Sequence, residues 1–348
     1  MSPRTTHALA PFSGLYGAIV AARLALYRAG IFKTHRINAP VISVGNLTTG
    51  GTGKTPLVAW LARAVAREGR SPCVLTRGYG RADAHRRVVV SDGARVLAEA
   101  REGGDEPRLL AEALSGLAAV VSDADRVAAA HWAMENLRSD AFILDDGFQH
   151  LRLARDLDVV TIDATNPWGG AHLLPRGRLR ERRSGLRRAD CVVVTRAELA
   201  ADLAVLRAEI APLTEAVVLT AQTRTLGLRT LGGDELAHAV EQPVAAFCGV
   251  GNPQAFFAHL RADGHTLVHT RAFPDHHPYT PEELTHFVRE AVRHGARTLL
   301  TTAKDGVKLR AQDFALPVYI VEVELQFDYP EALLTLVRQA LSTKTPPA

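Results

Sequence analysis

The stretch Gly45-Asn46-Leu47-Thr48-Thr49-Gly50-Gly51-Thr52-Gly53-Lys54-Thr55 decides the fold of this 348-residue chain. It follows a short β-branched segment, VISVGN from Val41, and precedes a segment with helical periodicity, PLVAWLARAVAREG from Pro56. A glycine-rich turn between a strand and a helix lets backbone N–H groups point at phosphate oxygens, and the helix dipole adds positive potential there. The stretch therefore predicts a phosphate-binding loop, in which Lys54 reaches the outer phosphates and the Thr55 hydroxyl binds magnesium.

This loop departs from the strict G-x-x-x-x-G-K-[ST] pattern at one position, because Thr48 stands where that pattern has glycine. A glycine-rich turn before an ordinary helix is the alternative interpretation. The KGGxGKT loop of partition ATPases is disfavoured, since its signature lysine falls at Thr49. The residues predicted to bind the nucleotide are Thr48, Thr49, Gly50, Gly51, Thr52, Gly53, Lys54 and Thr55.

Apolar runs continue to alternate with helical segments beyond this loop, beginning at Cys73, Ala118, Ala141, Asp158 and Cys191. This order predicts an α/β fold with a mostly parallel sheet and helices on both faces. The segment from Arg86 predicts a β-hairpin that turns at Asp92-Gly93. A second βα series starts near Val244. We expect an N-terminal helix in residues 1–36, a P-loop core in 37–221, a linker in 222–242 and a C-terminal α/β lobe in 243–348.

The N-terminal segment from residue 8 to 32 is mostly apolar but contains Arg23 and Arg28. It fits neither a secretory signal nor an uncharged spanning helix. A helix in a membrane interface and a helix packed on the protein's own core both fit. The net charge of +4 suits an anionic partner of any kind. The three cysteines lack CxxC spacing, which favours a reducing compartment without disulfides or a zinc site.

Acidic residues follow two of the predicted loops and strands. Asp145 and Asp146 end the apolar run FILDD, which is the layout of a metal-binding Walker B strand or of an acidic turn. Asp105 in GGDEP precedes a helix, where an N-terminal cap and a catalytic base are both possible. The loop around His276 and His277 follows another predicted strand.

An arginine-dense run extends from Arg176 to Arg188. It predicts either a solvated helix face or a phosphate-binding loop, because arginine binds phosphate in a bidentate manner. Nucleic acid is disfavoured as a partner, since no aromatic residues that could stack on bases alternate with these arginines.

Eight of these segments together resemble the tetraacyldisaccharide 4'-kinase family. They are SVGNLTTGGTGKTP at Ser43, TRGYGR at Thr76, GDEP at Gly104, LDDGFQH at Leu144, LLPRGRLRE at Leu173, GVGNPQAFF at Gly249, FPDHHPY at Phe273 and TTAKDGVKL at Thr301. The Thr48 departure is shared with the family. The last segment differs from the family's TEKDAVK form at Ala303 and Gly306 and keeps Lys304 and Asp305.

The resemblance implies a kinase that uses ATP and Mg²⁺ to phosphorylate the 4'-hydroxyl of an anionic glycolipid, the disaccharide 1-phosphate precursor of lipid A. It implies Asp105 as the catalytic base with the first DHH histidine, His276, as its partner, although His277 stays open, and Lys54 as a catalytic residue. It implies metal contacts from Thr55, Asp145, Asp146 and Glu181, and substrate contacts from Arg77, Gln149, His150, Arg176 and Arg180.

The resemblance also places the chain at the cytoplasmic face of the inner membrane as a peripheral or monotopic protein, with no obligatory protein partner, and favours the interfacial helix. Two other functions compete with this one. A soluble P-loop kinase of a small metabolite is the first. A GTP-hydrolysing switch or metallochaperone is the second, but the chain contains no guanine-binding NKxD-type segment.

Overall fold

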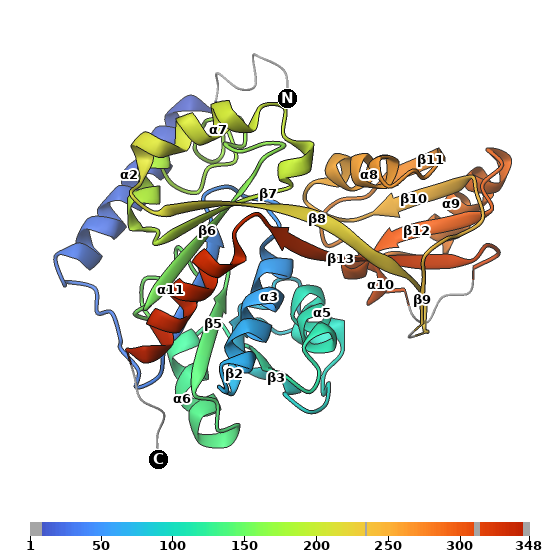
Figure 1. The fold of residues 1–348 in the computed structure, drawn as a ribbon. Helices are drawn as coiled ribbons and strands as arrows, with labels where there is room; N and C mark the ends of the chain where they lie inside the picture. The colour runs from blue at the N-terminus through green and yellow to red at the C-terminus, as the bar shows by residue number, and fades with distance from the viewer. Residues whose placement is uncertain (1–8, 234, 310–313, 344–348) are drawn as a thin grey trace.

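One sheet of 13 strands runs through the described part of the chain, which comprises residues 9–233, 235–309 and 314–343 of a computed structural model. It extends through a larger and a smaller lobe (Figure 1). The strands are β1 (Val41–Asn46), β2 (Pro72–Thr76), β3 (Val88–Asp92), β4 (Ala119–Ser122), β5 (Ala141–Asp145), β6 (Leu157–Asp163), β7 (Cys191–Thr195), β8 (Val217–Thr230), β9 (Leu236–Ala237), β10 (Val244–Cys248), β11 (Leu267–Ala272), β12 (Thr298–Thr302) and β13 (Val318–Phe327).

The helices cover both faces of this sheet. They are α2 (Ala10–Arg28), α3 (Lys54–Arg67), α4 (Ala100–Gly103), α5 (Asp105–Ala113), α6 (Arg126–Asn136), α7 (Leu203–Ile210), α8 (Pro253–Ala262), α9 (Pro281–Arg293), α10 (Ala303–Gly306) and α11 (Pro330–Ser342), with short 3-10 turns η1 (Arg183–Arg188), η2 (Ala197–Leu199) and η3 (Ala211–Leu213).

The larger lobe has the strand order β8-β7-β6-β1-β5-β2-β4-β3, and its strands are parallel except for β3. Helices α3, α5 and α11 pack on one face, and α6 and α7 pack on the other. Alternate residues of β1 supply both cores: Ile42 and Val44 face α3, whereas Val41 faces the α6 side. This burial of both faces explains why the strands appear in the sequence as continuous apolar runs.

The smaller lobe repeats the same plan with the strand order β11-β10-β12-β13, all parallel. Helix α9 covers one face and α8 covers the other. The predicted α/β fold with a mostly parallel sheet and a C-terminal α/β lobe is therefore confirmed.

Strands β8 and β13 join the two lobes. The first part of β8 pairs with β7 in the larger lobe, and the rest pairs in antiparallel fashion with β13 (Figure 1). The predicted linker 222–242 thus begins as a strand, and its residue 234 lies outside the described residues. A register shift opposite Leu226 and the mixed exposure of β8 broke the alternation that would have indicated a strand.

Helix α11 returns to the larger lobe, where Leu333 and Val337 are fully buried beside α3. The expected C-terminal lobe, 243–348, therefore contributes its last helix to the core of the other lobe. The sequence indicated an amphipathic helix at this position but not the surface on which it packs.

The predicted hairpin turns where expected. The Asp92 carboxylate accepts hydrogen bonds from the backbone N–H groups of Ala94 and Arg95, and Leu97 N–H donates to the Val90 carbonyl at 2.8 Å. Its return arm makes only an isolated bridge, so β3 joins the sheet through β4 instead.

Helix α2 lies along the outside of the larger lobe (Figure 1). Only Ser13 and Gly17 are buried within it, and they touch the loop at Leu173. Phe12, Leu15 and Ile19 are 62%, 62% and 59% exposed. The helix is long and apolar enough to cross a membrane by length and composition, and 11% of its apolar window is buried. Packing on the protein's own core does not account for such a surface. The preceding residues 1–8 lie outside the described part of the chain.

Candidate active site

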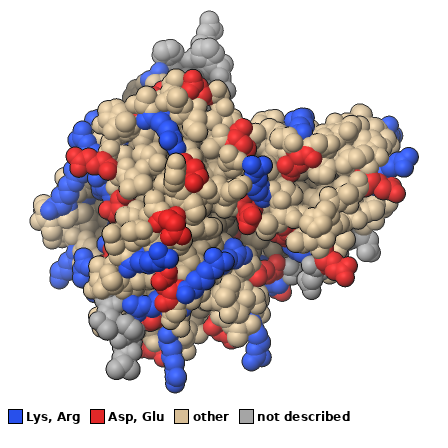
Figure 2. All heavy atoms as spheres, in the orientation of Figure 1, with Lys and Arg blue, Asp and Glu red and all other residues tan. Residues whose placement is uncertain are grey.

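A cavity of about 290 Å³ lies where the two lobes meet. The surface is hollowed there, and basic and acidic side chains intermingle on the face shown in Figure 2. The cavity is lined at the carboxyl ends of strands from both lobes. These contributions are the β1–α3 loop, Thr76 at the end of β2, Asp145 and Asp146 at β5, Thr195 at the end of β7, Gly251 and Asn252 after β10, His276 after β11, Thr302 at the end of β12, and Lys304 in α10. In parallel α/β sheets this edge is where ligands bind.

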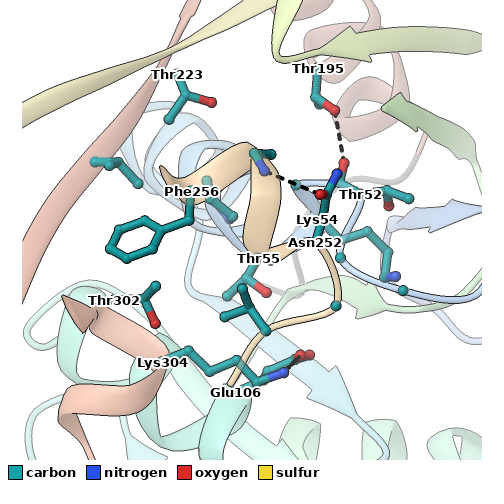
Figure 3. A pocket seen from close by; sticks show the side chains of 18 of the residues that line it. Thr52, Lys54, Thr55, Glu106, Thr195, Thr223, Asn252, Phe256, Thr302 and Lys304 are labelled. Carbon is teal, nitrogen blue, oxygen red and sulfur yellow. Dashed lines mark hydrogen bonds and ion pairs between the residues drawn. The ribbon is translucent and has the colours of Figure 1, made fainter. Parts of the chain in front are cut away.

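Hydrogen bonds at Thr52 fix the position of the β1–α3 loop, which forms one wall of the cavity. The Thr52 hydroxyl accepts a hydrogen bond from Asn46 Nδ2 at 2.9 Å and lies 2.8 Å from the Thr161 hydroxyl. The Thr195 hydroxyl donates to the Thr52 carbonyl at 2.9 Å (Figure 3). Gly53 has a φ of 77°, a left-handed conformation that glycine adopts without strain, and α3 begins at the next residue. This geometry turns the loop into the helix N-terminus.

Thr48 is extended rather than left-handed. It forms an antiparallel bridge with Leu179, and the Thr49 N–H donates to the Arg178 carbonyl at 2.7 Å. A glycine is not required for that conformation, which explains the departure from the strict motif. Thr48 and Thr49 line a small separate pocket behind the loop, so the predicted nucleotide residues that line the main cavity are those from Gly50 to Thr55.

The smaller lobe touches this loop directly. A Cβ on Gly251 would collide with the backbone of Gly51, so only glycine fits at this contact. Asn252 caps α8 through its Oδ1, and its Nδ2 donates to Asp163 at 2.8 Å in the larger lobe. The two lobes thus meet directly at the phosphate-binding loop.

The two acids of the β5 end have different surroundings. Lys54 Nζ lies 3.5 Å from Asp146, and Arg180 Nη1 lies 2.7 Å from both of its carboxylate oxygens. Burial by itself raises the pKa of Asp146, but Lys54 and Arg180 outweigh it and hold the pKa below its ordinary value. Asp146 is therefore ionised and paired.

Asp145 is buried and less well compensated. Its Oδ2 accepts from the Thr76 hydroxyl at 3.1 Å, whereas its Oδ1 has no partner among the described residues. Burial, together with the charges of Glu106 and Asp146, raises the pKa of Asp145 to about 7. An unpaired buried carboxylate oxygen at a cavity wall is suited to receive a cation.

Glu181, predicted to contact a metal, is 2% exposed and already bound by cationic and polar groups. Arg188 donates to both of its oxygens at 2.8 and 3.0 Å, and Gln149 Nε2 donates to its Oε1 at 2.9 Å. Glu181 is not among the described residues that line the cavity.

Asp105 and His276 lie 171 residues apart in the sequence but touch in the structure. His276 Nδ1 is 2.9 Å from each carboxylate oxygen of Asp105. Gly104 occupies the N-cap position of α5, so the interpretation of Asp105 as the helix cap is wrong. His277 instead contacts Glu283 at 2.9 Å.

The hydrogen bond between these two residues shifts the pKa of each. Burial raises the pKa of Asp105, but the hydrogen bond from His276 and the charge of Lys304 outweigh burial, so the pKa lies below its ordinary value. The same hydrogen bond raises the pKa of His276. The side chain of His276 is 31% exposed and lines the cavity, whereas that of Asp105 is 8% exposed and lies behind it.

Comparisons with known proteins identify the family to which the chain belongs. The family model described as tetraacyldisaccharide-1-P 4'-kinase matches residues 5–342. This chain belongs to that family.

Relatives named tetraacyldisaccharide 4'-kinase include proteins from Geobacter metallireducens, which is 42% identical over 96% of this chain and 97% of its own, and Anaeromyxobacter dehalogenans strain 2CP-C, which is 46% identical over 84% and 79%. A crystal structure of the "apo" form of LpxK from Aquifex aeolicus in complex with ATP superposes with a TM-score of 0.78 at 32% identity, over 97% of this chain and 99% of that one. The family predicted from the motifs is confirmed, and the family match does not support the small-metabolite kinase or the GTPase switch.

The residues predicted to contact the lipid substrate of a tetraacyldisaccharide 4'-kinase lie at different distances from the cavity. Arg77 and Arg180 line the cavity. Gln149 lies next to it, because its Oε1 accepts from Arg180 at 3.3 Å. Arg176 lies farther out, where its backbone N–H donates to the Ser13 hydroxyl of α2 at 3.1 Å.

His150, the last of the predicted substrate residues, is buried near two arginines, Arg126 and Arg155. Burial, Arg126 and Arg155 lower the pKa of His150 to about 4, so it is neutral, and its Nε2 has no partner within the described ranges.

Arg126 is a residue that the sequence analysis missed. It is 5% exposed, and its Nε likewise has no partner in the described structure. Burial lowers its pKa, while Asp145 raises it. The signal available was an arginine directly before the apolar run from Val127 to Ala130, at the first position of the helix.

Lys304 and Glu106 were also missed as cavity residues. Lys304 Nζ lies 2.7 Å from Glu106 and 2.9 Å from Asp275, and Figure 3 shows its side chain extending to Glu106. Each belongs to a quoted motif, GDEP or TTAKDGVKL, but nothing in the two segments indicates that they meet.

Proposed function

We propose that this chain transfers the γ-phosphoryl group of ATP to the 4'-hydroxyl of a tetraacyldisaccharide 1-phosphate, the anionic precursor of lipid A. The observation that carries the proposal is the His276–Asp105 pair, which faces the same cavity as the loop from Gly50 to Thr55. A phosphate-binding loop and a proton-accepting pair on one cavity are what phosphoryl transfer to an alcohol needs.

The loop supplies binding and charge stabilisation. Backbone N–H groups of residues 50–55 and the α3 N-terminus hold the phosphates. Lys54 Nζ lies 3.5 Å from Asp146. This contact holds the ammonium group, before the nucleotide binds, at the position where the outer phosphates will lie. Charge that develops on the transferring group is stabilised by a cation positioned in advance, with little reorganisation during the reaction.

Mg²⁺ fits this site through Asp145 and Thr55. The free Oδ1 of Asp145 and the Thr55 hydroxyl both belong to cavity residues. No cluster of three or more His, Cys, Asp or Glu side chains able to hold a metal occurs among the described residues, which suits an ion that keeps waters and phosphate oxygens as ligands. When bound, Mg²⁺ neutralises charge on the β- and γ-phosphate oxygens. Asp146 and Glu181 would have to release Arg180 and Arg188 before contacting it.

The His276–Asp105 pair is proposed to accept the proton of the acceptor hydroxyl. A sugar hydroxyl does not ionise unaided near neutral pH, and a positioned base contributes about 10²–10⁴ in rate. Ionised Asp105 accepts a hydrogen bond from His276 Nδ1, which stabilises the ring after it takes up a proton. The two residues are expected to act as a unit.

One basic residue that lines the cavity and one that is buried beside it support recognition of the lipid phosphate. Arg77 lines the cavity, and Arg126 is a buried cation near Asp145 whose Nε lacks a partner in the described chain. A buried arginine without a full set of acceptors is costly unless an anion completes it. The 1-phosphate of the acceptor supplies such an anion.

Helix α2 supports a membrane location. Its exposed apolar side chains, Phe12, Leu15 and Ile19, and its arginines suit a helix whose apolar face enters a lipid interface. A tetraacylated acceptor resides in that interface. We propose the cytoplasmic face of the inner membrane, where ATP is available, as the site of action.

The decisive experiment measures transfer of radiolabel from [γ-³²P]ATP to purified tetraacyldisaccharide 1-phosphate in mixed micelles. We expect a Mg²⁺-dependent labelled lipid that is resistant to removal of the 1-phosphate, because the label lies at the 4' position. The same lipid without its 1-phosphate is the matched control and should be a much poorer substrate. Absence of labelled lipid, with labelled phosphate released to water instead, would refute the kinase assignment.

A further inference from the structure

Lys304 is the only described lysine that contacts the cavity-facing nitrogen of His276. Its Nζ lies 3.3 Å from His276 Nε2, in addition to its contacts with Glu106 at 2.7 Å and Asp275 at 2.9 Å. Burial by itself would lower the pKa of Lys304, but Glu106, Asp105 and Asp275 raise it, so the amine is charged. An ammonium group has three N–H donors and no acceptor, and here each donor has one partner.

This arrangement favours one tautomer of the neutral imidazole. Because Lys304 can only donate, it makes a hydrogen bond to His276 Nε2 when that nitrogen presents its lone pair. The proton of the neutral ring is then on Nδ1, which donates to the Asp105 carboxylate. A second proton on Nε2 would bring an N–H against an ammonium group 3.3 Å away, so Lys304 opposes formation of the imidazolium.

The side chain of the next residue, Asp305, fixes the position of Lys304. Asp305 is fully buried and accepts hydrogen bonds from Gly249 N–H at 3.0 Å, the Tyr279 hydroxyl at 2.9 Å and the Thr302 hydroxyl at 2.7 Å. These bonds tie the start of α10 to the loops after β10 and β11. The TTAKDGVKL segment thereby aligns Lys304 with the histidine loop.

We propose that Lys304 is a positioning residue that opposes protonation of His276 and holds the neutral ring with its proton toward Asp105 and its Nε2 lone pair toward the cavity. The inference rests on the proposed kinase function. The contact with Nε2 is the longest of the three that Lys304 makes, so an acceptor hydroxyl can replace it while Glu106 and Asp275 retain the ammonium group. Nε2 then takes the hydroxyl proton as the oxygen bonds to the γ-phosphorus and the bond from that phosphorus to ADP breaks.

The charged and titratable groups that face His276 come from several elements. Asp105 raises the pKa of its ring and Lys304 lowers it, and Asp275 of its own loop also raises it. Glu106 lies 4.0 Å from Nε2. Tyr79 and Arg77 line the same cavity from the loop after β2, and Lys308 Nζ lies 3.9 Å from an Asp105 carboxylate oxygen. Lys304 is the cation that contacts the ring itself, so its removal is expected to have the largest effect.

The test is a ¹⁵N-histidine NMR titration of the full chain in detergent, without ATP or lipid, with His276 assigned from a His276→Gln spectrum. In the parent we expect a neutral ring protonated on Nδ1. In Lys304→Met the pKa of His276 should rise by about one unit or more, as removal of an adjacent like charge predicts. Lys304→Arg should stay near the parent. Lys308→Met removes a lysine charge 3.9 Å from Asp105 and 3.0 Å from Asp305 but no contact with the ring, and it should shift the pKa of His276 less.

The pH profile of turnover gives a second readout. The acid limb of Lys304→Met should move to higher pH by the same amount, so a shift of one unit costs about tenfold at pH values below the limb. Turnover should recover at high pH, whereas a merely structural role would lower it at every pH.

A parent ring protonated on Nε2, an unchanged pKa in Lys304→Met, or an equal shift in Lys308→Met would each overturn the inference. If Lys304→Met does not fold, the parent tautomer and the Lys304→Arg titration decide it. Absence of lipid phosphorylation by the parent would refute the proposed function and leave this titration valid.

Discussion

Loss of the Asp105–His276 contact should reveal that the two residues act as one unit. The ring takes on positive charge in the transition state, 2.9 Å from the Asp105 oxygens. At an effective dielectric constant of 20 the attraction between unit charges at that distance is about 6 kcal/mol. Partial exposure of the ring and the opposing Lys304 charge reduce this value, so we expect a coupling of roughly 2–3 kcal/mol, or about 30- to 150-fold in rate.

The assay is a double-mutant cycle on turnover with saturating ATP and lipid. Asp105→Ala and His276→Ala should each lower turnover by about 10²–10⁴. The double variant should lose much less than the product of the two losses. ATP affinity, measured by calorimetry, is the control and should change little. Multiplicative losses would refute the unit, and a large loss of ATP affinity in Asp105→Ala would make Asp105 a nucleotide or metal ligand instead.

The pH dependence of turnover gives a related test with a defined sign. The Asp105 hydrogen bond raises the pKa of His276, so the acid limb of the parent lies above the ordinary histidine value. In Asp105→Asn that limb should move to lower pH while the maximal rate falls. A limb that stays in place would show that a group other than His276 titrates there.

Three further variants test the other parts of the site. Lys54→Ala should lower turnover by at least a few orders of magnitude, and near-normal turnover would remove the kinase assignment from this loop. Deletion of the residues before Lys33 should shift the chain from the membrane to the soluble fraction and weaken use of the lipid with ATP binding intact, whereas Lys54→Ala, the control, should remain in the membrane fraction. Asp145→Asn should abolish Mg²⁺-dependent turnover. Since the folded-state pKa of Asp145 is raised to about 7, ionisation destabilises the fold as pH rises toward 7, so Asp145→Asn should raise the melting temperature at pH 8 without Mg²⁺ and change it little at pH 4. An equal effect at both pH values would contradict that charge assignment.

The sequence by itself determined the fold class and the family, and it predicted the phosphate-binding loop. Each of these depends on local patterns. A glycine-rich turn between a strand and a helix, and apolar runs alternating with helical periods, constrain the backbone over a few residues and are visible along the chain. The apolar character of α2 was equally readable, since it needs only composition.

Only the tertiary structure decided which side chains meet. Asp105 and His276 are 171 residues apart, and their contact depends on how β8 and β13 hold the two lobes against each other. The same packing places His276 beside Asp105 and His277 beside Glu283. It also brings Lys304 to Glu106, and it buries Arg126 without a full set of described partners. Propensity and periodicity report what a segment does with its neighbours in sequence. The charge environment of a cavity depends instead on distances of a few ångströms between distant segments, and these distances exist only in the folded chain.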